Sequence, residues 1–299
     1  SLSSDLAMIR NCVFTGTVQG KSKVGGICGL NGNSVIENCY SIADITGTSN
    51  VGGICGMMTY NPHGVSIKCC YSVGKVSGGD YDGYIYAIGS IVGFSDPSNS
   101  GVGIENCYYD KNVSSLGAIG TDEYDSSAAD NEANNVKGLT TAELCGTTLP
   151  NGFGSVWAAG KIKTSEPNGK FRTVTYTYPS LNGVGTAYSV KTQEYNFKIN
   201  STGADDWQEY TLIENEAQFI AIGNDSTSWG KNYVLAKELN LSGKTITPIG
   251  NNGTSFTGKF SGDGYTIKNV KMSTDEDLSG GYGLFGVNTG LIMNLAVEG

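Results

Sequence analysis

A six-residue phrase of this chain is repeated without change. Residues 24–29 read VGGICG, and residues 51–56, which begin 27 positions later, read the same. A shorter phrase, Ile-any-Asn-Cys, also returns, with Cys in place of Asn in one copy, beginning at Ile9, Ile36, Ile67 and Ile104. Self-similarity at a period of ~20–50 residues is typical of proteins that are built from stacked repeats. The sequence therefore predicts coils of roughly 27 residues.

The residues that follow each Ile-any-Asn phrase alternate in character. In the second copy one parity carries Cys39, Ser41, Ala43 and Ile45, and the other carries Tyr40, Ile42 and Asp44. A period of two indicates a β-strand, and these repeats show no apolar stripe at helical spacing. Short strands between Gly, Asn and Ser favour coils that stack at ~4.8 Å per turn. We therefore expect an all-β fold, a right-handed parallel β-solenoid (β-helix) of roughly 27-residue coils with short capping helices.

The recurring asparagines have a structural role in such a fold. Each corner of a coil needs a residue that accepts a positive φ angle, which Gly does freely and Asn at modest cost. The corner positions, where amides would stack in an outer ladder, are Asn11, Asn38, Asn106, Asn269 and Asn294. Cys69 takes this position once and interrupts the ladder. We also expect one inward-facing column made of Ile9, Ile36, Ile67 and Ile104.

The eight cysteines look at first like a disulfide framework. Four of them share one repeat position: Cys12, Cys39, Cys70 and Cys107. Val270 and Leu295 hold the same position in later copies, which indicates an apolar core site, and unpaired Cys is often buried. We expect a column of reduced thiols, although disulfides between neighbouring rungs would be within reach. Because no CxxC motif and no Cys/His spacing indicates zinc, we expect no metal or redox role for the cysteines.

Several phrases resemble the GLUG-motif repeats of bacterial secreted and surface proteins, which are named for Gly-Leu-any-Gly. The motif stands intact at residues 283–286, and in variant or worn form at 26–29, 53–56 and 90–93. Residues 233–270 resemble the opening of such a module, and the phrases NCYYDKNV, GLTTAEL and YPSL resemble its close. Members include adhesins and regions that flank IgA-cleaving peptidases. Since repeat architecture defines the family, the resemblance implies a surface protein but little about chemistry.

The order of these phrases predicts pieces of two modules. The closing phrases precede the opening ones, so we expect the end of one GLUG-type β-solenoid at 1–181, a linker or hairpin at 182–206, and the start of a second β-solenoid at 207–299. The acidic stretch 122–135 is expected to be a surface loop. Two capping pairs predict short helices, Thr140 with Glu143 and Asn215 with Gln218. Open coil ends have unpaired strand edges, so we also expect head-to-tail self-association through them.

The chain is acidic, with 19 Lys and Arg against 28 Asp and Glu and a net charge of -9. Without a cluster of basic residues it is a poor candidate for binding nucleic acid or an anionic membrane. No apolar run approaches the ~20 residues of a transmembrane helix, so we expect no membrane insertion. No signal peptide is present; for the secreted or cell-surface bacterial protein that the resemblance implies, the signal sequence would lie outside this chain.

Insertions that lengthen the later coils carry the candidate ligand-binding residues. They are Tyr60 and His63 in one insertion and Asp80, Tyr81, Asp82, Tyr84 and Tyr86 in another. Exposed rings stack on apolar sugar faces and carboxylates accept hydroxyl hydrogen bonds; the alternative is that these tyrosines pack on their own coil. No cofactor is expected, apart from candidate structural calcium sites at Asp122, Asp125, Asp130 and Glu132 or at Asp275, Glu276 and Asp277, which are otherwise merely solvated acidic loops.

Three functions stay open. The leading hypothesis is a non-enzymatic, secreted or cell-surface, adhesin-like repeat protein that presents loops to a glycan or a host surface protein. A β-helical polysaccharide lyase or hydrolase would need stacked Asp, Lys or Arg at one strand position, whereas the aligned positions hold Cys, Ser, Gly, Ala and Val. The third is a purely structural stalk or spacer. No catalytic residue is predicted, since the chain has no HExxH motif and no evident nucleophile beside its one histidine.

Overall fold

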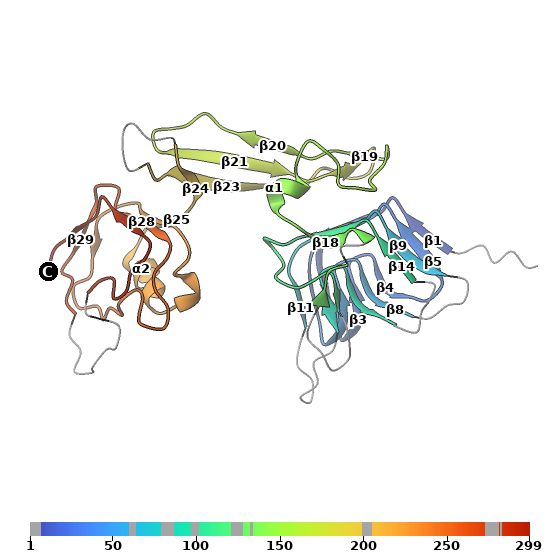
Figure 1. The fold of residues 1–299 in the computed structure, drawn as a ribbon, viewed down its shortest axis with the longest axis horizontal. Coiled ribbons are helices and arrows are strands. Elements are labelled where there is room, and N and C mark those ends of the chain that lie inside the picture. Colours follow the sequence, from blue (N-terminus) through green and yellow to red (C-terminus); the bar gives the residue numbers. More distant parts are fainter. Residues whose placement is uncertain are drawn as a thin grey trace, which may run out of the picture. The chain divides into compact units, whose positions relative to one another are not determined.

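The computed structural model contains stacked rows of short strands (Figure 1). It describes residues 7–59, 64–78, 87–96, 102–120, 128–131, 134–198, 205–272, 281 and 283–299. The chain divides into two compact units, the first made of Ser1–Lys163 with Thr175–Val190 and the second of Thr164–Val174 with Lys191–Gly299. Each unit contains parallel sheets whose strands come from successive turns of the chain, so the predicted all-β solenoid is confirmed.

The first sheet of unit 1 forms the isoleucine column. Its strands are all parallel: β1 (Ala7–Arg10), β5 (Ser34–Glu37), β9 (Val65–Lys68) and β14 (Val102–Glu105). The register places four residues opposite one another, Ile9, Ile36, Ile67 and Ile104. The second and third of these are completely buried, and the fourth is nearly so. The predicted inward column is therefore confirmed.

A second parallel sheet begins after the asparagine corner. Its strands are β2 (Val13–Gln19), β6 (Tyr40–Gly47), β10 (Tyr71–Val73), β11 (Val76–Gly78), β15 (Cys107–Asp110) and β18 (Val136–Leu139). Val136 lies beside Cys107 in register, so a valine continues the cysteine column. Cys39, Cys70 and Cys107 are fully buried, and all eight cysteines are free thiols in the structure. The column is thus an apolar core position, as the exchange of Cys for Val and Leu predicts.

Two shorter sheets complete each coil. One contains β3 (Ser22–Gly25), β7 (Ser49–Gly52) and β12 (Ile88–Gly89); the other contains β4 (Cys28–Asn31), β8 (Cys55–Met58), β13 (Val92–Ser95) and β16 (Ile119–Gly120), to which β17 (Ala128–Ala129) pairs antiparallel. The repeated phrase VGGICG forms the corner between these two shorter sheets. A Cβ on Gly26 would lie 2.6 Å from the carbonyl oxygen of Gly53 in the next coil. The coils can therefore stack at this corner only without a side chain.

The asparagine corners have the predicted left-handed backbone. The φ angles lie between 51° and 54° at Asn11, Asn38, Asn106, Asn269 and Asn294, and Cys69 has a φ of 52°. Asn135, which the sequence placed in a surface loop, also has a φ of 54° and donates from Nδ2 to Oδ1 of Asn106 at 3.2 Å. It is a further corner of the same kind, so the loop prediction is wrong at this end.

Cys69 is the least suitable residue at these corners, so we expect Cys69→Asn to stabilise unit 1. The left-handed conformation costs most L residues ~1–2 kcal/mol and Asn less, which predicts a gain of about 0.5–1 kcal/mol in the free energy of unfolding. The thiol only donates to the carbonyl oxygen of Gly152, at 3.1 Å, a bond that an amide can replace. Urea denaturation would measure the gain, with Cys69→Ala as the control that keeps the strain. A lower unfolding midpoint for Cys69→Asn would contradict it.

After the last coil the chain forms helix α1 (Thr141–Leu144) and the antiparallel pair β19 (Trp157–Ala158) and β22 (Ser180–Leu181). Helix α1 begins with the predicted capping box. The backbone N–H of Glu143 donates to Oγ1 of Thr140 at 3.2 Å, and the backbone N–H of Thr140 donates to Oε2 of Glu143 at 2.7 Å. Both bonds satisfy N–H groups that a helix N-terminus leaves without partners, so the prediction of this helix is confirmed.

A four-stranded sheet has the order β20 (Lys161–Thr164), β21 (Phe171–Thr177), β23 (Ser189–Asn196) and β24 (Trp207–Glu209). β23 lies within the range 182–206 and pairs antiparallel with β24. In unit 2, Arg172 forms an ion pair with Glu194 at 2.6 Å and stacks over the ring of Trp207, with its Cζ 4.4 Å from the ring centroid. These contacts tie neighbouring strands of the sheet together.

Unit 2 repeats the solenoid pattern. One parallel sheet contains β25 (Thr211–Ile213), β26 (Tyr233–Leu235), β28 (Lys259–Ser261) and β30 (Leu291–Met293), and the other contains β27 (Leu239–Asn240), β29 (Thr266–Lys268) and β31 (Ala296–Val297). Helix α2 (Glu216–Gly223) and the short 3-10 helix η2 (Ser226–Ser228) lie between β25 and β26 in the chain.

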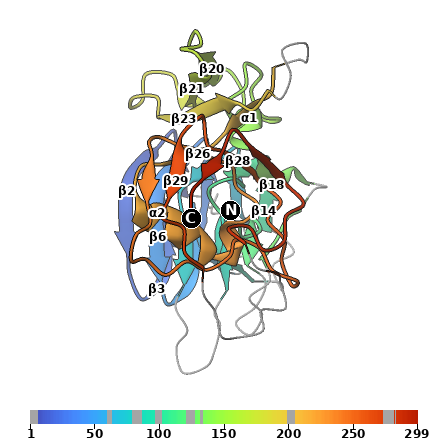
Figure 2. The same cartoon turned by 90° about the vertical axis from the view of Figure 1, so that its left-hand side faces the viewer.

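Helix α2 lies beside β28 and β29 in two perpendicular views (Figures 1 and 2). The ring of Phe219 meets that of Phe260 edge to face, with 6.0 Å between the centroids. The predicted cap is confirmed, because the backbone N–H of Gln218 donates to Oδ1 of Asn215 at 2.9 Å. Within the residues that the structure describes, no helix is long and apolar enough to cross a membrane.

Candidate functional site

The interior of unit 1 is filled with side chains. The isoleucine and cysteine columns pack there with Ile54, Met58 and Val92, all of which are completely buried. A ligand must therefore meet the outer face of the coils, and the outward parity of the second sheet is the face with the most distinctive chemistry. Three outward-facing residues of this sheet form a column of aromatic rings.

The register aligns Tyr40, Tyr71 and Tyr108 on this outer face. The first two rings are stacked, with centroids 4.9 Å apart and planes 3° from parallel. All three side chains are nevertheless buried, and burial raises the pKa of Tyr108 to about 12 and that of Tyr71 well above its usual value. Another part of the chain must therefore cover this tyrosine column.

The cover is the part of unit 1 that follows the last coil, residues 141–163 and 175–181. Phe153, Trp157, Tyr178 and Leu181 are buried against the tyrosine column. The hydroxyl of Tyr71 donates to the carbonyl oxygen of Pro179 at 2.6 Å, and the Trp157 indole N–H donates to Oδ1 of Asn38 at 3.0 Å. Because these bonds reach from the segment to the coils, they hold it in place on the outer face.

A buried carboxylate anchors the end of this cover. Asp110, at the end of β15, accepts hydrogen bonds from the Tyr178 hydroxyl at 2.5 Å, the Thr141 hydroxyl at 2.8 Å and the backbone N–H of Asn112 at 2.9 Å. Burial, followed by the interactions with Asp110, raises the pKa of Tyr178 far above its usual value. Asp110 and the tyrosines of the column therefore have a structural role, because they hold the cover on the coils.

An open groove of about 340 Å³ begins where the cover ends. Its floor contains Thr15, Ile42 and Val73, which are in register on β2, β6 and β10. Its walls contain Val113 and Tyr188, whose side chains are 43% and 38% exposed. The groove therefore combines an apolar floor with an accessible aromatic ring.

Polar groups stand at the edge of this groove. Asp44 is exposed on β6, and its Oδ1 accepts a hydrogen bond from the backbone N–H of Lys75 at 2.9 Å, which fixes the direction of the carboxylate. Thr15 adds an exposed hydroxyl. Tyr188 is held by its neighbours, since its carbonyl accepts from the N–H of Tyr178 at 2.9 Å and the two rings lie 5.7 Å apart. A ring, a carboxylate and a hydroxyl around an apolar floor are the groups that contact a sugar.

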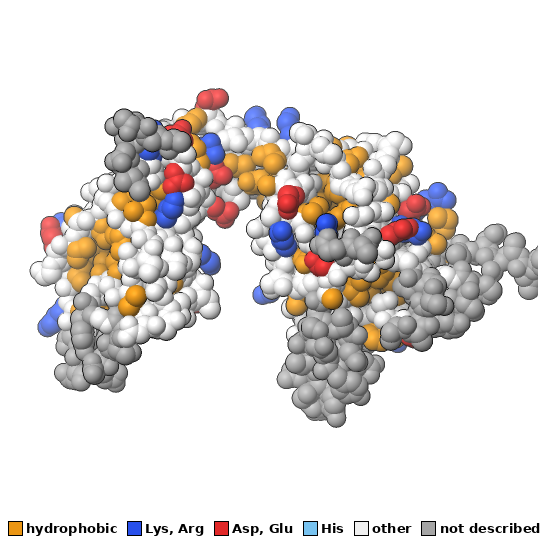
Figure 3. All heavy atoms as spheres, in the orientation of Figure 1, with side chains coloured by type: hydrophobic (Ala, Val, Ile, Leu, Met, Phe, Trp, Pro, Cys, Tyr) orange, Lys and Arg blue, Asp and Glu red, His pale blue; other side chains and the backbone are white. Residues whose placement is uncertain are grey.

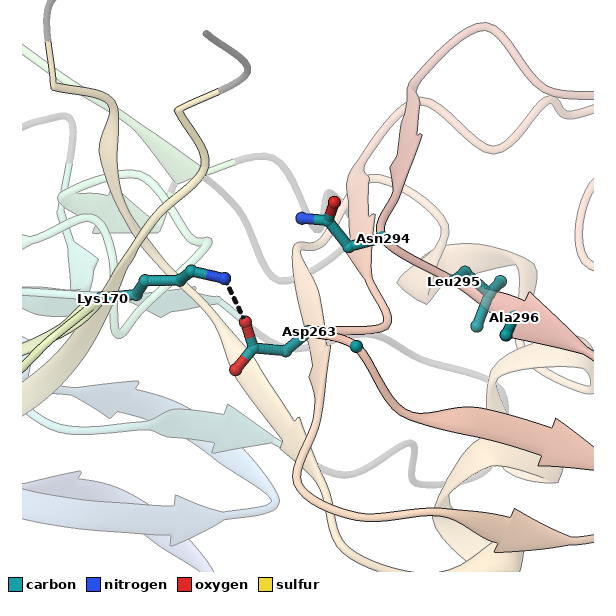
Figure 4. A pocket seen from close by; sticks show the side chains of 6 residues that line it. Lys170, Asp263, Asn294, Leu295 and Ala296 are labelled. Carbon is teal, nitrogen blue, oxygen red and sulfur yellow. Dashed lines mark hydrogen bonds and ion pairs between the residues drawn. The ribbon is translucent and has the colours of Figure 1, made fainter. Parts of the chain in front are cut away.

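Unit 2 has a more polar pocket of about 550 Å³. Asp263 accepts hydrogen bonds from Nζ of Lys170 and from the hydroxyl of Tyr195, both at 2.7 Å, and the bond to Asp263 raises the pKa of Lys170. The Asn294 side chain points toward this ion pair (Figure 4). Among the described residues, the lining of this pocket includes no aromatic ring and its charges are already paired. It therefore offers fewer contacts to a sugar than the groove of unit 1.

The seven residues predicted from the insertions all lie outside the described residues: Tyr60, His63, Asp80, Tyr81, Asp82, Tyr84 and Tyr86. Of the candidate calcium ligands, Asp130 alone is described. Its carboxylate accepts from the backbone N–H of Ala118 at 2.9 Å and of Gly138 at 3.2 Å. Across the described ranges, no group of three or more His, Cys, Asp and Glu side chains could hold a metal ion.

The residues that shape the candidate site were not predicted from the sequence. Tyr40, Tyr71 and Tyr108 each follow a column cysteine directly, so their shared repeat position was a visible signal for an aromatic column. Asp44 was assigned correctly to the parity opposite the core-facing residues. Tyr188 lies outside the repeats, and no local pattern connects it with Asp44, 144 positions earlier.

In a comparison with protein families, residues 22–46 match the family described as the GLUG motif. The matched stretch runs from β3 into β6 and includes Gly26-Ile27-Cys28-Gly29, the variant that forms the tight corner between two sheets. No curated protein and no solved structure matches the chain. The first unit therefore carries a GLUG motif, and this repeat forms one turn of its β-solenoid.

Proposed function

We propose that this chain is a non-enzymatic, adhesin-like repeat protein that is secreted or held at a bacterial cell surface and binds a glycan in the groove of unit 1. The observation that carries this proposal is the exposed ring of Tyr188 beside the fixed carboxylate of Asp44 over an apolar floor. Such a surface suits a pyranose ring, whose apolar face stacks on the aromatic side chain while its hydroxyls donate to the carboxylate.

The charge of the protein supports a neutral or cationic partner rather than nucleic acid. The net charge is -9, and on the face shown in Figure 3 the Lys and Arg side chains are scattered rather than gathered in a patch. An acidic surface repels a phosphate backbone. A sugar carries no such charge, and a groove with one carboxylate has a suitable hydrogen-bond acceptor for it.

A glycan array probed with wild-type protein and with Tyr188→Ala tests this proposal. We expect binding to a defined set of glycans and a loss of about tenfold in affinity for the variant, since the lost ring contact amounts to ~1.4 kcal/mol. Asp44→Asn keeps the size of the side chain but removes its charge, and we expect a smaller loss. Isothermal titration with the best glycan would measure both.

Tyr265→Ala is the matched control, because this tyrosine is 40% exposed in unit 2, outside the groove. Equal losses for Tyr188→Ala and Tyr265→Ala, or no glycan bound by the wild type, would refute the groove as a glycan site. A wild type that binds host surface proteins but no glycan would favour the other adhesin-type partner. Head-to-tail self-association through the coil ends stays a prediction that sedimentation would test.

A further inference from the structure

Two cysteines of the repeated phrase form a pair that the glycan proposal does not use. Cys28 on β4 and Cys55 on β8 are in-register neighbours in parallel strands. The next residues of their column are Val92 and Ile119, so the column contains two thiols and then becomes apolar. Cys28 is half-buried and Cys55 is completely buried. The two sulfur atoms therefore lie at the partly exposed end of a column whose other residues are apolar.

The two side chains adopt the same conformation. Sγ of Cys28 lies 3.3 Å from the carbonyl oxygen of Leu30, and Sγ of Cys55 lies 3.3 Å from that of Met57, each two residues further along its own strand. Identical conformations on paired strands place equivalent atoms one strand spacing apart, which is about 4.7–4.9 Å. The sulfur atoms are therefore separated by about this distance.

This separation matches a particular kind of metal site. A metal ion held between two thiolates on a straight line separates them by twice the metal–sulfur bond, or about 4.6 Å for a bond of about 2.3 Å. Soft monovalent ions such as copper(I) prefer thiolate ligands. A tetrahedral zinc site would need further ligands, and the described part of the chain holds no cluster of three or more suitable side chains.

We propose that Cys28 and Cys55 bind one soft, two-coordinate monovalent cation, such as copper(I), as a linear bis-thiolate. Binding breaks two S–H bonds and forms two metal–sulfur bonds, so two protons leave the pair. The complex carries one net negative charge, and the exposed side of Cys28 keeps this charge near water. The sequence predicted no metal role because it lacks a zinc spacing; the pair becomes visible only through the register.

Silver(I) is a redox-inert probe of the same class, and it would be titrated into the reduced full chain in chloride-free buffer. Native mass spectrometry counts bound ions, and X-ray absorption at the silver edge reports the number of sulfur ligands. We expect the wild type to bind one more ion per chain than Cys28→Val or Cys55→Val, and the extra ion to have two sulfur neighbours. Val is suitable because Val92 occupies the same column. Copper(I) supplied without oxygen should give the same difference.

Cys69→Asn is the matched control, since it removes one thiol at a corner where Asn is the usual residue. It should bind as many ions as the wild type. Circular dichroism would verify that all variants are folded. The proposal fails if the wild type and Cys55→Val bind equal numbers of ions, if Cys69→Asn loses as many as Cys55→Val, or if the extra ion has more than two sulfur ligands.

Discussion

Gly53→Ala is expected to lower the free energy of unfolding of unit 1 by about 3 kcal/mol or more, at the upper end of the cost of overpacking. A Cβ at this position would collide with the carbonyl oxygen of Ser90 and with the side chain of Ser72. The hydroxyl of Ser72 donates to that same carbonyl oxygen at 2.5 Å, so neither group can move without breaking a buried bond. Gly26, in the coil before, meets the side chain of Ser41 in the same way.

Urea denaturation followed by circular dichroism would measure this loss, and hydrogen exchange of residues 7–59 would assign it to unit 1. Gly103→Ala is the matched control. Gly103 lies in β14 of the same solenoid, and its added Cβ would make an ordinary contact of 3.7 Å with Cβ of Ser66. We expect its stability to change by no more than about 1 kcal/mol, because Ala reduces the entropy of the unfolded chain. Similar losses for both variants would contradict this account of the corner.

This packing explains the spacing of the motif in physical terms. The first glycine of the motif, Gly26 or Gly53, has no Cβ that would collide with the side chain of Ser41 or Ser72. The last glycine allows a second close approach, because a Cβ on Gly29 would lie 2.6 Å from the carbonyl oxygen of Lys23. The residues between them, Ile27 and Cys28, pack on the core. The glycines of the motif thus specify a corner of the coil.

The coils were predictable from the sequence because their contacts recur. Most coils place similar residue types at the same position, so the Ile-any-Asn-Cys phrase is enough to predict both the inward column and the left-handed corners. The prediction of corners and columns failed in the coil that no longer contains the Ile-any-Asn-Cys phrase. Asn135 and Val136 continue a corner and a column, but the residues before them no longer match the repeat.

The cover and the groove could not be predicted in the same way. The contact between Tyr71 and Pro179 joins residues 108 positions apart, and no pattern in either segment specifies the other. The groove depends on this cover, because it opens where the cover ends and takes Tyr188 from the position directly before β23. The sequence showed an outward Asp44 and a series of tyrosines, and the fold decided which rings are buried and which one is accessible.

Trp157→Ala is expected to release the cover from the tyrosine column. The Trp157 ring lies against Phe153, Tyr40 and Tyr71, with centroid distances of 4.4, 5.8 and 5.7 Å. It is 4% exposed, so its removal leaves a large cavity and should cost about 3–5 kcal/mol. Hydrogen exchange should accelerate throughout residues 144–163 and 175–181. The phenols of Tyr40 and Tyr71 should then ionise closer to pH ~10, their value in water, which a spectrophotometric titration would detect.

Trp157→Phe separates packing from hydrogen bonding, because it keeps a ring but removes the donor to Asn38. We expect a loss of about 0.5–1.5 kcal/mol, the net contribution of one hydrogen bond, because Asn38 is only half-buried, with the cover still in place. Because Tyr178 of the cover packs on Tyr188, Trp157→Ala should also weaken glycan binding in the groove, whereas Trp157→Phe should leave it almost unchanged. Unchanged exchange of residues 144–163 and 175–181 in Trp157→Ala would show that the cover is held by other contacts, of which the bonds to Asp110 are the strongest candidates.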